Sequence, residues 1–271
     1  MAIPFRHRYA ALAAGLLVVA AAAPAAVTAT RSPAVASGGP LRIGVTTTAE
    51  AAGERVYLPE GFEAEIAEAL AARLKVPFEL VRVEPERKAE ALDAGRVDVL
   101  LDRLPADVRE TGDAPIVRTG YASGQRVAMR TDTTVRAWAD LKGRTVCVSR
   151  DNLDGQRLAR EIGANTRLSS APAPALIDVR TGACDASIHD AALLAPLLEK
   201  RIWRKFSATL PETARTELAI VVSPRAAQFV EWIAEAAAGV ADAPGWRDRA
   251  GKWASTVDFE VYRDQVAADC H

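Results

Sequence analysis

TGACDASIHDAALLA, residues Thr181 to Ala195, contains a helix end, a short strand and the start of a second helix. Gly182 can end a helix, and Cys184 to Ile188 is a mostly apolar run of strand length. Asp190 follows at a position suited to cap the Leu- and Ala-rich segment behind it. Polar side chains at the carboxyl end of a strand, here His189 and Asp190, lie where open α/β sheets bind ligands. We therefore expect a binding cleft at this point.

Residues 1–29 have the pattern of a secretory signal rather than of a folded segment. Arg6 and Arg8 form a basic start, Tyr9 to Ala23 is almost wholly apolar, and small-residue cleavage patterns follow. The alternative is an uncleaved membrane anchor, because the apolar run is just long enough to span a bilayer. Residues 30–40, rich in Ala, Pro, Ser and Gly, are expected to form a flexible leader. The signal predicts that the mature protein lies in the periplasm.

The composition bounds the class of protein. The net charge is −1, and loss of Arg6 and Arg8 with the signal lowers it to −3. That balance, with no basic run, argues against nucleic acid as a partner. The remaining length allows one large domain or two small ones, and 49% hydrophobic residues are enough for a packed core.

The first half of the folded region alternates strands and helices. Leu41 to Val45 is a buried-strand pattern, and residues 61–74 repeat apolar residues at helical spacing. A strand at 77–83, a helix at 86–95 and a strand at 97–101 follow. This order predicts a parallel sheet with right-handed crossovers.

The second half repeats the scheme. It has strands at 145–149, 166–170 and 184–188, and helices at 154–163 and 174–182. Each half also places an Asp three residues after a Gly that ends a helix, Gly95 with Asp98 and Gly182 with Asp185. The repeated order indicates two similar α/β lobes rather than one sheet.

Two extended segments, 124–132 and 216–224, are expected to connect the lobes. The predicted fold is therefore a bilobal α/β protein with a two-strand hinge, which lets the lobes close on a ligand. Lobe 1 would comprise 41–126 and 222–271, and lobe 2 would comprise 127–221.

Residues 41–253 resemble the periplasmic solute-binding proteins of ABC importers, in particular the polar amino-acid group typified by glutamine-binding protein. The resemblance is carried by EGFEAEIAEALAARL, by AGRVDVLL followed by an Arg, by DLKGRTVCVS and above all by GACDASIHD. It implies the type II periplasmic binding fold and a role in amino-acid transport without catalysis. It also implies that Asp190 binds the ligand's α-amino group and that an Arg after the first-lobe strand, here Arg109, binds its α-carboxylate.

The chemistry of a free amino acid favours the same pair. A zwitterion needs a carboxylate opposite a guanidinium, and the planar fork of Arg holds a carboxylate with two parallel hydrogen bonds. Each residue also has a simpler interpretation: Asp190 as a helix N-cap alone, and Arg109 as a solvated surface residue.

Three loops depart from the family pattern. The loop after the first strand, which includes Thr47, has Tyr57 as its nearest aromatic residue. Asp102 and Arg103 stand where Gly and Thr are usual, and Ser149-Arg150-Asp151-Asn152 replaces a Ser-Gly-Thr turn. The ligand therefore need not be a standard α-amino acid. Further candidates for contact with the ligand are His189, Arg103, Asp102, Ser149, Arg150, Asn152, Tyr57 and Thr47, with Arg103 and Arg150 suited to a second anionic group and Asp102, Asp151 and Asp154 to a cationic one.

Cys147 and Cys184 lie in strands that the resemblance makes neighbours, and some amino-acid binders of the family carry Cys at both positions. Outside the cytoplasm a disulfide between them is expected, with two buried free thiols as the alternative. Cys270 is left over and either stays free or pairs between chains.

The leading hypothesis is a non-enzymatic importer component that hands a small polar solute to an inner-membrane permease. The alternatives are a module that serves another periplasmic protein and a dehydratase-like enzyme on the same scaffold. No cofactor or metal is expected, because the folded region has too few His residues for a His-rich site and Asp151 to Asp154 lacks the spacing of a calcium loop. We expect a monomer.

Overall fold

The first sheet contains two neighbouring parallel strands that precede and follow the first helix in the chain. In the computed structural model, which describes residues 39–46, 51–52, 55–108, 110–240 and 243–265, β1 (Leu41–Val45) pairs in parallel with β4 (Phe78–Arg82) and β5 (Val99–Pro105). The sheet order is β4-β1-β5-β12-β7-β6, and β12 (Thr216–Val222), β7 (Ala114–Ser123) and β6 (Glu110–Thr111) run antiparallel to their neighbours. A separate short hairpin joins β2 (Ala51–Ala52) and β3 (Arg55–Val56).

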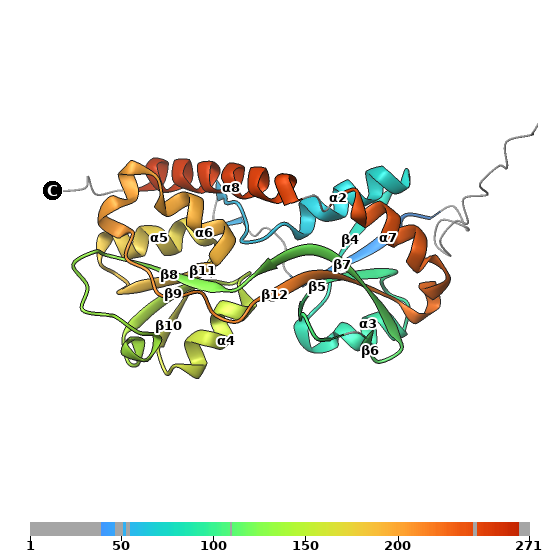
Figure 1. Ribbon diagram of the computed structural model, residues 1–271, viewed down its shortest axis with the longest axis horizontal. Helices are drawn as coiled ribbons and strands as arrows, with labels where there is room; N and C mark the ends of the chain where they lie inside the picture. Colours follow the sequence, from blue (N-terminus) through green and yellow to red (C-terminus); the bar gives the residue numbers. More distant parts are fainter. Residues whose placement is uncertain (1–38, 47–50, 53–54, 109, 241–242, 266–271) are drawn as a thin grey trace, which may run out of the picture. The chain divides into compact units, whose positions relative to one another are not determined.

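The second sheet has the order β10-β9-β11-β8 (Figure 1). Its strands β9 (Thr145–Ser149), β10 (Asn165–Ser169) and β11 (Ala186–Asp190) are parallel, and β8 (Gln125–Met129) runs antiparallel to β11. The predicted β-α-β-α-β order of each half is therefore confirmed, with antiparallel strands added where the chain passes between the sheets.

The helices predicted at 61–74, 86–95, 154–163 and 174–182 begin and end within two residues of those limits. The α-helices are α2 (Glu63–Leu74), α3 (Lys88–Asp93), α4 (Leu153–Glu161), α5 (Pro172–Thr181), α6 (Ala191–Leu198), α7 (Val230–Ala238) and α8 (Ala243–Asp264). Short 3-10 turns are η1 (Pro85–Arg87), η2 (Trp138–Leu141), η3 (Arg201–Phe206) and η4 (Pro224–Phe229). The described part of the chain contains no helix that is both long and apolar enough to cross a membrane.

The two halves share the same contact at their repeated Gly and Asp. The backbone N–H of Arg42 donates to the Asp98 carboxylate at 2.9 Å, and that of Thr145 donates to Asp185 at 2.9 Å. The glycine three residues earlier, Gly95 or Gly182, has a left-handed backbone that ends the helix. The repeated Gly and Asp therefore have the same role in each half. The Gly ends a helix, and the Asp three residues later binds the backbone at the start of the neighbouring strand.

The chain crosses between the sheets twice. It passes from β7 to β8 at Gly124 and returns through the segment before β12. The crossings are joined where Gln125 N–H donates to Thr213 Oγ1 at 2.8 Å and Thr213 N–H donates to Gln125 O at 3.1 Å. These crossings are the expected two-strand hinge.

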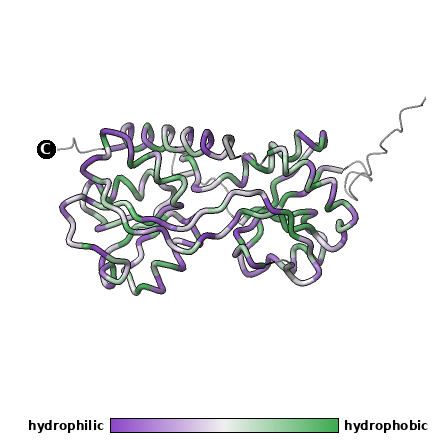
Figure 2. The backbone as a smooth tube through the Cα atoms, in the orientation of Figure 1, coloured by the Kyte–Doolittle hydropathy of each residue, from purple (hydrophilic) through white to green (hydrophobic). Residues whose placement is uncertain are grey.

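The final helix α8 packs on elements of both sheets. Trp253 Nε1 donates to Pro59 O at 2.9 Å, whereas Asp258 accepts from Trp203 Nε1 at 2.8 Å, beside α6. Figure 2 shows hydrophilic and hydrophobic stretches alternating along this helix, as expected when only one face is buried. The prediction placed 222–271 wholly in the first lobe, but α8 contacts α5 and α6 as well. The residue limits of the lobes stay a prediction.

The buried hydrophobic residues in the described part of the chain form three clusters. One large buried cluster includes Leu41 and Ile66 beside the first sheet, Leu176 and Trp203 beside the second, and Trp246 of α8. Two smaller clusters fill the remaining face of each sheet. All these residues belong to one compact unit, Arg31–His271, while the predicted signal at 1–29 and the leader up to residue 38 lie outside the described residues.

Candidate functional site

A cavity of about 370 Å³ lies where strand ends of both sheets face each other. Thr46 follows β1, Leu101 to Arg103 belong to β5, Gln125 begins β8, and Asp190 ends β11. Asn152, the N-cap of α4, completes the wall from the second sheet. Strand ends and helix starts are the usual place of ligand sites in open α/β sheets, and this volume suits a small molecule.

Asp190 is the most heavily bonded carboxylate of this site. Its Oδ1 accepts from Tyr121 Oη at 2.9 Å, from Ser123 Oγ at 2.7 Å and from the N–H groups of Ala192 and Leu193. Its Oδ2 accepts from Arg103 Nη2 at 2.7 Å. Asp190 is therefore both the N-cap of α6 and the partner of a cation from the first sheet.

Arg103 reaches Asp190 from β5. Its guanidinium lies 4.8 Å from the centre of the Tyr121 ring, which packs in turn against Phe62 and Trp246. Burial and the Asp190 charge raise the pKa of Tyr121 well above its ordinary value, so its hydroxyl stays a donor to Asp190. The pair links the first sheet to the second.

Glu60 lies in the loop before α2, yet its carboxylate is bound by the second sheet. Oε2 accepts from Ser149 Oγ at 2.7 Å and from His189 Nδ1 at 3.0 Å. Oε1 accepts from Asn152 Nδ2 at 3.1 Å and from the backbone N–H of Asp190. Glu60 is 6% exposed, so this is a buried anion with four donors, which such a charge requires.

His189 is part of the wall behind the cavity rather than of its surface. Its side chain is fully buried and does not line the cavity. Because a carboxylate only accepts, Nδ1 carries the proton of the Glu60 contact, and Nε2 contacts Ser187 Oγ at 2.9 Å. His189 therefore orients Glu60.

Two further acids of the cavity have raised pKa values. Burial and the neighbouring Glu60 carboxylate raise the pKa of Asp151 to about 7, although Asp151 accepts from Glu60 N–H. Burial raises the pKa of Glu63, part of whose side chain stays open to the cavity, while Arg103 acts in the opposite direction. Both groups therefore hold a proton more strongly than an ordinary carboxyl, and a cation bound beside them would favour their charged form.

Among the described residues that line the cavity there are more acids than bases, seven against four. Three of the bases already form ion pairs with acids of the same lining: Lys88 with Asp102 at 2.5 Å, Arg103 with Asp190 at 2.7 Å and Arg157 with Asp154 at 2.9 Å. The other acids are Glu60, Glu63, Glu86 and Asp151, and the fourth base, Arg160, is exposed. The arrangement suits a positively charged molecule.

The structure brings together five of the predicted site residues and separates others. Asp190, His189, Arg103, Ser149 and Asn152 form the connected set described above. Asp102 lines the cavity beside Lys88, and Arg150 is exposed outside it. Tyr57 is buried in the core, with the Arg263 guanidinium 5.7 Å from its ring. Thr47 and Arg109 lie outside the described residues.

Sequence reasoning missed Glu60, Tyr121 and Ser123. The signal for Glu60 was an acid between Pro59 and Gly61, ahead of a helix whose first turn is also acidic. The signal for Ser123 was its place before Gly124, where the chain changes sheet. Neither residue has a local motif, because their partners lie 67 or more positions away in the sequence.

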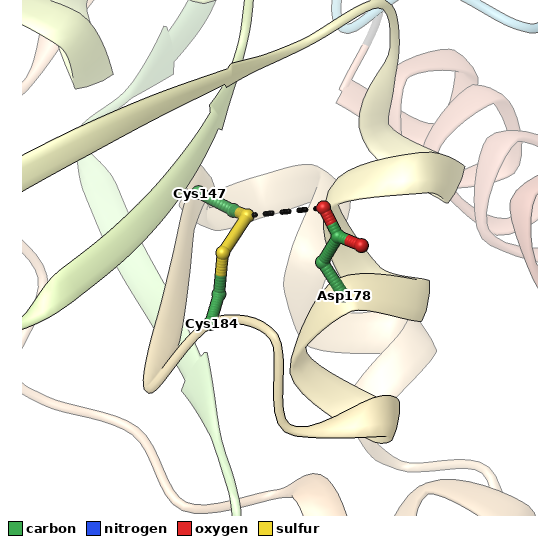
Figure 3. A group of neighbouring side chains, drawn as sticks. All are labelled: Cys147, Asp178 and Cys184. Atoms are coloured by element: carbon green, nitrogen blue, oxygen red, sulfur yellow. Dashed lines mark hydrogen bonds between the residues drawn. A yellow bond between two sulfur atoms is a disulfide. The ribbon is translucent and has the colours of Figure 1, made fainter.

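Cys147 and Cys184 form the expected disulfide (Figure 3). Asp178 Oδ2 lies 3.5 Å from Cys147 Sγ, and the ligand atoms of the three side chains lie within 4.8 Å of one another. A disulfide sulfur has no proton to donate and is not a thiolate ligand, so in this oxidised form the group is structural. Asp178 is instead paired with Arg167 at 3.3 Å.

Residues 41–256 match the bacterial extracellular solute-binding proteins, family 3. The chain belongs to this family. The match covers both sheets and most of α8, so the type II periplasmic binding fold and the resemblance seen in the sequence are confirmed. The solute-binding proteins of this family are extracellular by description, and amino-acid ABC transporter proteins are among the similar solved structures.

The similarity to solved structures of this fold covers most of the chain. An arginine-binding protein variant from T. maritima is 16% identical, with 84% of this chain and 97% of that chain covered and a TM-score of 0.55. An ancestral arginine-binding protein bound to arginine is 20% identical, with 79% and 98% covered and a TM-score of 0.55. An ancestral amino acid-binding protein, a precursor of cyclohexadienyl dehydratase, is 19% identical, with 81% and 96% covered and a TM-score of 0.56. At these identities the likeness shows the fold, and no curated protein matches the chain in sequence.

Proposed function

We propose that this chain is a periplasmic solute-binding protein that holds a small cationic solute in the cavity between its two sheets and presents it to an inner-membrane ABC permease. The excess of acids on the cavity lining carries the proposal. Membership of the family supports the binding role, and arginine-binding proteins among the solved neighbours support a cationic solute. Arg109 and Thr47 remain candidate contacts from the first sheet.

A binding role fits the site better than catalysis. Acid–base chemistry needs a titrating group within reach of the bound molecule. His189 is fully buried behind Glu60 and does not line the cavity. A dehydratase-like activity would have to use carboxyl groups of the lining, such as Asp151 with its pKa of about 7.

The proposal is tested by a thermal-shift screen of residues 30–271, unfolded and refolded to remove carried-over ligand. Cationic, neutral and acidic solutes of similar size are compared. A cation at a hundredfold over its dissociation constant should add about 2.7 kcal/mol to the free energy of unfolding, and acidic solutes should add nothing. Equal stabilisation by acidic solutes, or a flat screen, contradicts the proposal.

A matched pair of variants locates the binding. Glu63→Gln removes an acid of the lining and should weaken cation binding about tenfold, which corresponds to about 1.4 kcal/mol. Glu65→Gln, in the same helical turn but outside the cavity, should leave it unchanged. Equal effects of the two variants would place the solute elsewhere.

The second candidate function is an accessory module for another periplasmic protein. The direct Arg103–Asp190 pair favours it, because this contact already pairs a first-sheet cation with the carboxylate that would bind a solute's amino group. A flat screen together with a one-to-one complex of the refolded chain with a purified periplasmic partner would support this second function.

A further inference from the structure

Two charged side chains from the side of the first sheet fill polar positions on the second sheet. The Glu60 carboxylate lies on the donors of Ser149, Asn152, His189 and the Asp190 backbone. The Arg103 guanidinium lies on the Asp190 carboxylate. The second sheet thus offers one anion-binding position and one cation-binding position, and both are occupied by the protein itself.

The two positions are adjacent, since both include Asp190. Its backbone N–H binds the Glu60 anion, and its side chain binds the Arg103 cation. A free α-amino acid also carries an anion and a cation separated by a single carbon atom. Donors and a carboxylate on one residue are what such a zwitterion needs from the protein.

We propose that Glu60 and Arg103 act as a built-in substitute for a zwitterionic ligand, so that the cleft excludes free α-amino acids and accepts an organic cation that has no α-carboxylate. The inference rests on the proposed function, which places the solute in the cavity between the two sheets. It goes further by naming the class of cation and the two residues that set the selectivity.

Displacement of the two side chains by an amino acid is unfavourable. Glu60 and Arg103 are tethered to the chain, so their contacts form at a high effective concentration that a free solute does not match. Glu60 is also buried, and without its four donors its charge would lose its partners. An α-carboxylate would therefore have to replace an anion that is already fully bonded.

A cation without a carboxylate meets no such competition. The cavity beside the occupied positions is lined by Glu63 and Asp151, whose pKa values burial raises. An ammonium or guanidinium group bound beside them favours their charged form, so each can supply a negative charge to the cation. Arg157 and Arg160 also line the cavity, but both are exposed to solvent, which screens their charge. Diamines and guanidino-amines of amino-acid size have the required charge.

Isothermal titration of the wild-type chain with matched pairs tests the selectivity. Agmatine is compared with arginine, cadaverine with lysine, and putrescine with ornithine, so that the members of a pair differ by one carboxylate. Each amine should bind at least tenfold more tightly than its amino acid. Equal or tighter binding of the amino acids overturns the inference and leaves the proposed function standing. Binding of neither set overturns the inference, and the wider solute screen then decides the proposed function.

A double variant tests the role of the two residues. Glu60→Ala with Arg103→Ala empties both positions, and arginine, lysine and ornithine should then bind at least tenfold more tightly than to wild type. Arg130→Ala with Asp132→Ala removes the same pair of charges from an exposed site, 53% and 67% accessible, and should change no affinity. If the folded double variant gains no affinity for amino acids, Glu60 and Arg103 are not the selectivity residues. The titration of wild type needs no variant and tests the selectivity even if the double variant does not fold.

Discussion

Asp190 and its donors give the clearest prediction for a single residue. Five donors converge on its carboxylate, among them the Arg103 guanidinium and two N–H groups of α6. Asp190→Ala leaves the Arg103 charge without its partner and removes the helix cap, so it should lower the free energy of unfolding by about 3–5 kcal/mol. Urea unfolding followed by circular dichroism measures this loss.

The control for that variant is Asp132→Ala, which breaks an ion pair of similar length at the surface. Exposed pairs contribute about 0–1 kcal/mol, so this change should be small. A loss for Asp190→Ala no larger than for Asp132→Ala would show that the buried network adds little to stability.

Asp151 predicts a pH dependence of stability. Its pKa rises from an ordinary value of 3.8 to about 7 in the folded chain, through burial and the Glu60 charge. Between about pH 4 and 7 the folded state keeps a proton that the unfolded state has lost, so stability due to this group falls as pH rises through that window. The melting temperature of the Asp151→Asn variant should therefore fall less than that of wild type when the pH is raised from 5 to 8. Parallel melting curves for the two proteins contradict the assignment.

The same residues show what the sequence could predict at this scale. Asp190 was found because a strand end, a helix start and a motif coincide within a few positions. Glu60 was not, since its role arises from contacts with residues that lie 89 to 130 positions later. Local patterns predict which strand, helix or loop carries a side chain. They do not predict which distant hydrogen-bond donors the fold brings to that side chain.

At the scale of elements, the crossing at Gly124 depends on the absence of a side chain. A Cβ atom there would meet the carbonyl oxygen of Thr213 closer than such atoms approach in proteins. Gly124→Ala should therefore destabilise the chain by about 1–3 kcal/mol, because a crossing segment must shift. Gly251→Ala, in α8 with open space at its Cβ position, should instead stabilise by about 0.5–1 kcal/mol. Thermal unfolding of both variants distinguishes a local clash from a general effect of added methyl groups.

The disulfide joins two elements of the second sheet. Cys147 and Cys184 are 37 positions apart, and closing a loop of that length stabilises by about 4 kcal/mol in the chain-entropy model. Cys147→Ala with Cys184→Ala should lower the melting temperature, and Cys270→Ala should not. Thiol counting on the protein without reductant should find at most one free thiol per chain, that of Cys270. Three thiols would contradict the bond.

Elements with a clear period were predicted well, and those set by tertiary contacts were not. The strand at 145–149 has the predicted bounds because an apolar run and a turn define it. Helix α8 extends to Asp264, because its later buried residues, Val257 and Val261, pack as part of the large core cluster. The same contacts place α8 against α5 and α6, which no local pattern indicates.

At the scale of the whole described unit, two kinds of contact oppose separation of the sheets. Helix α8 and the double crossing connect them permanently, while Glu60 and Arg103 connect them through side chains alone. Ligand binding in a hinged protein normally supplies the second kind of contact, because full contact forms only in the closed state. Here Glu60 and Arg103 make such contacts, so we expect closure without a solute.

Small-angle scattering tests this closure directly. The wild-type chain without solute should have the radius of gyration of a compact unit, roughly 18 Å for 240 residues, and arginine should not change it. Glu60→Ala with Arg103→Ala removes the side-chain contacts but leaves the crossings, so the sheets should separate about the hinge and the radius should increase. The Arg130→Ala, Asp132→Ala double variant should keep the wild-type radius, since its charges lie at an exposed turn. A wild-type radius that falls on addition of arginine would mean that the chain is open in solution and that the two side chains do not hold it closed.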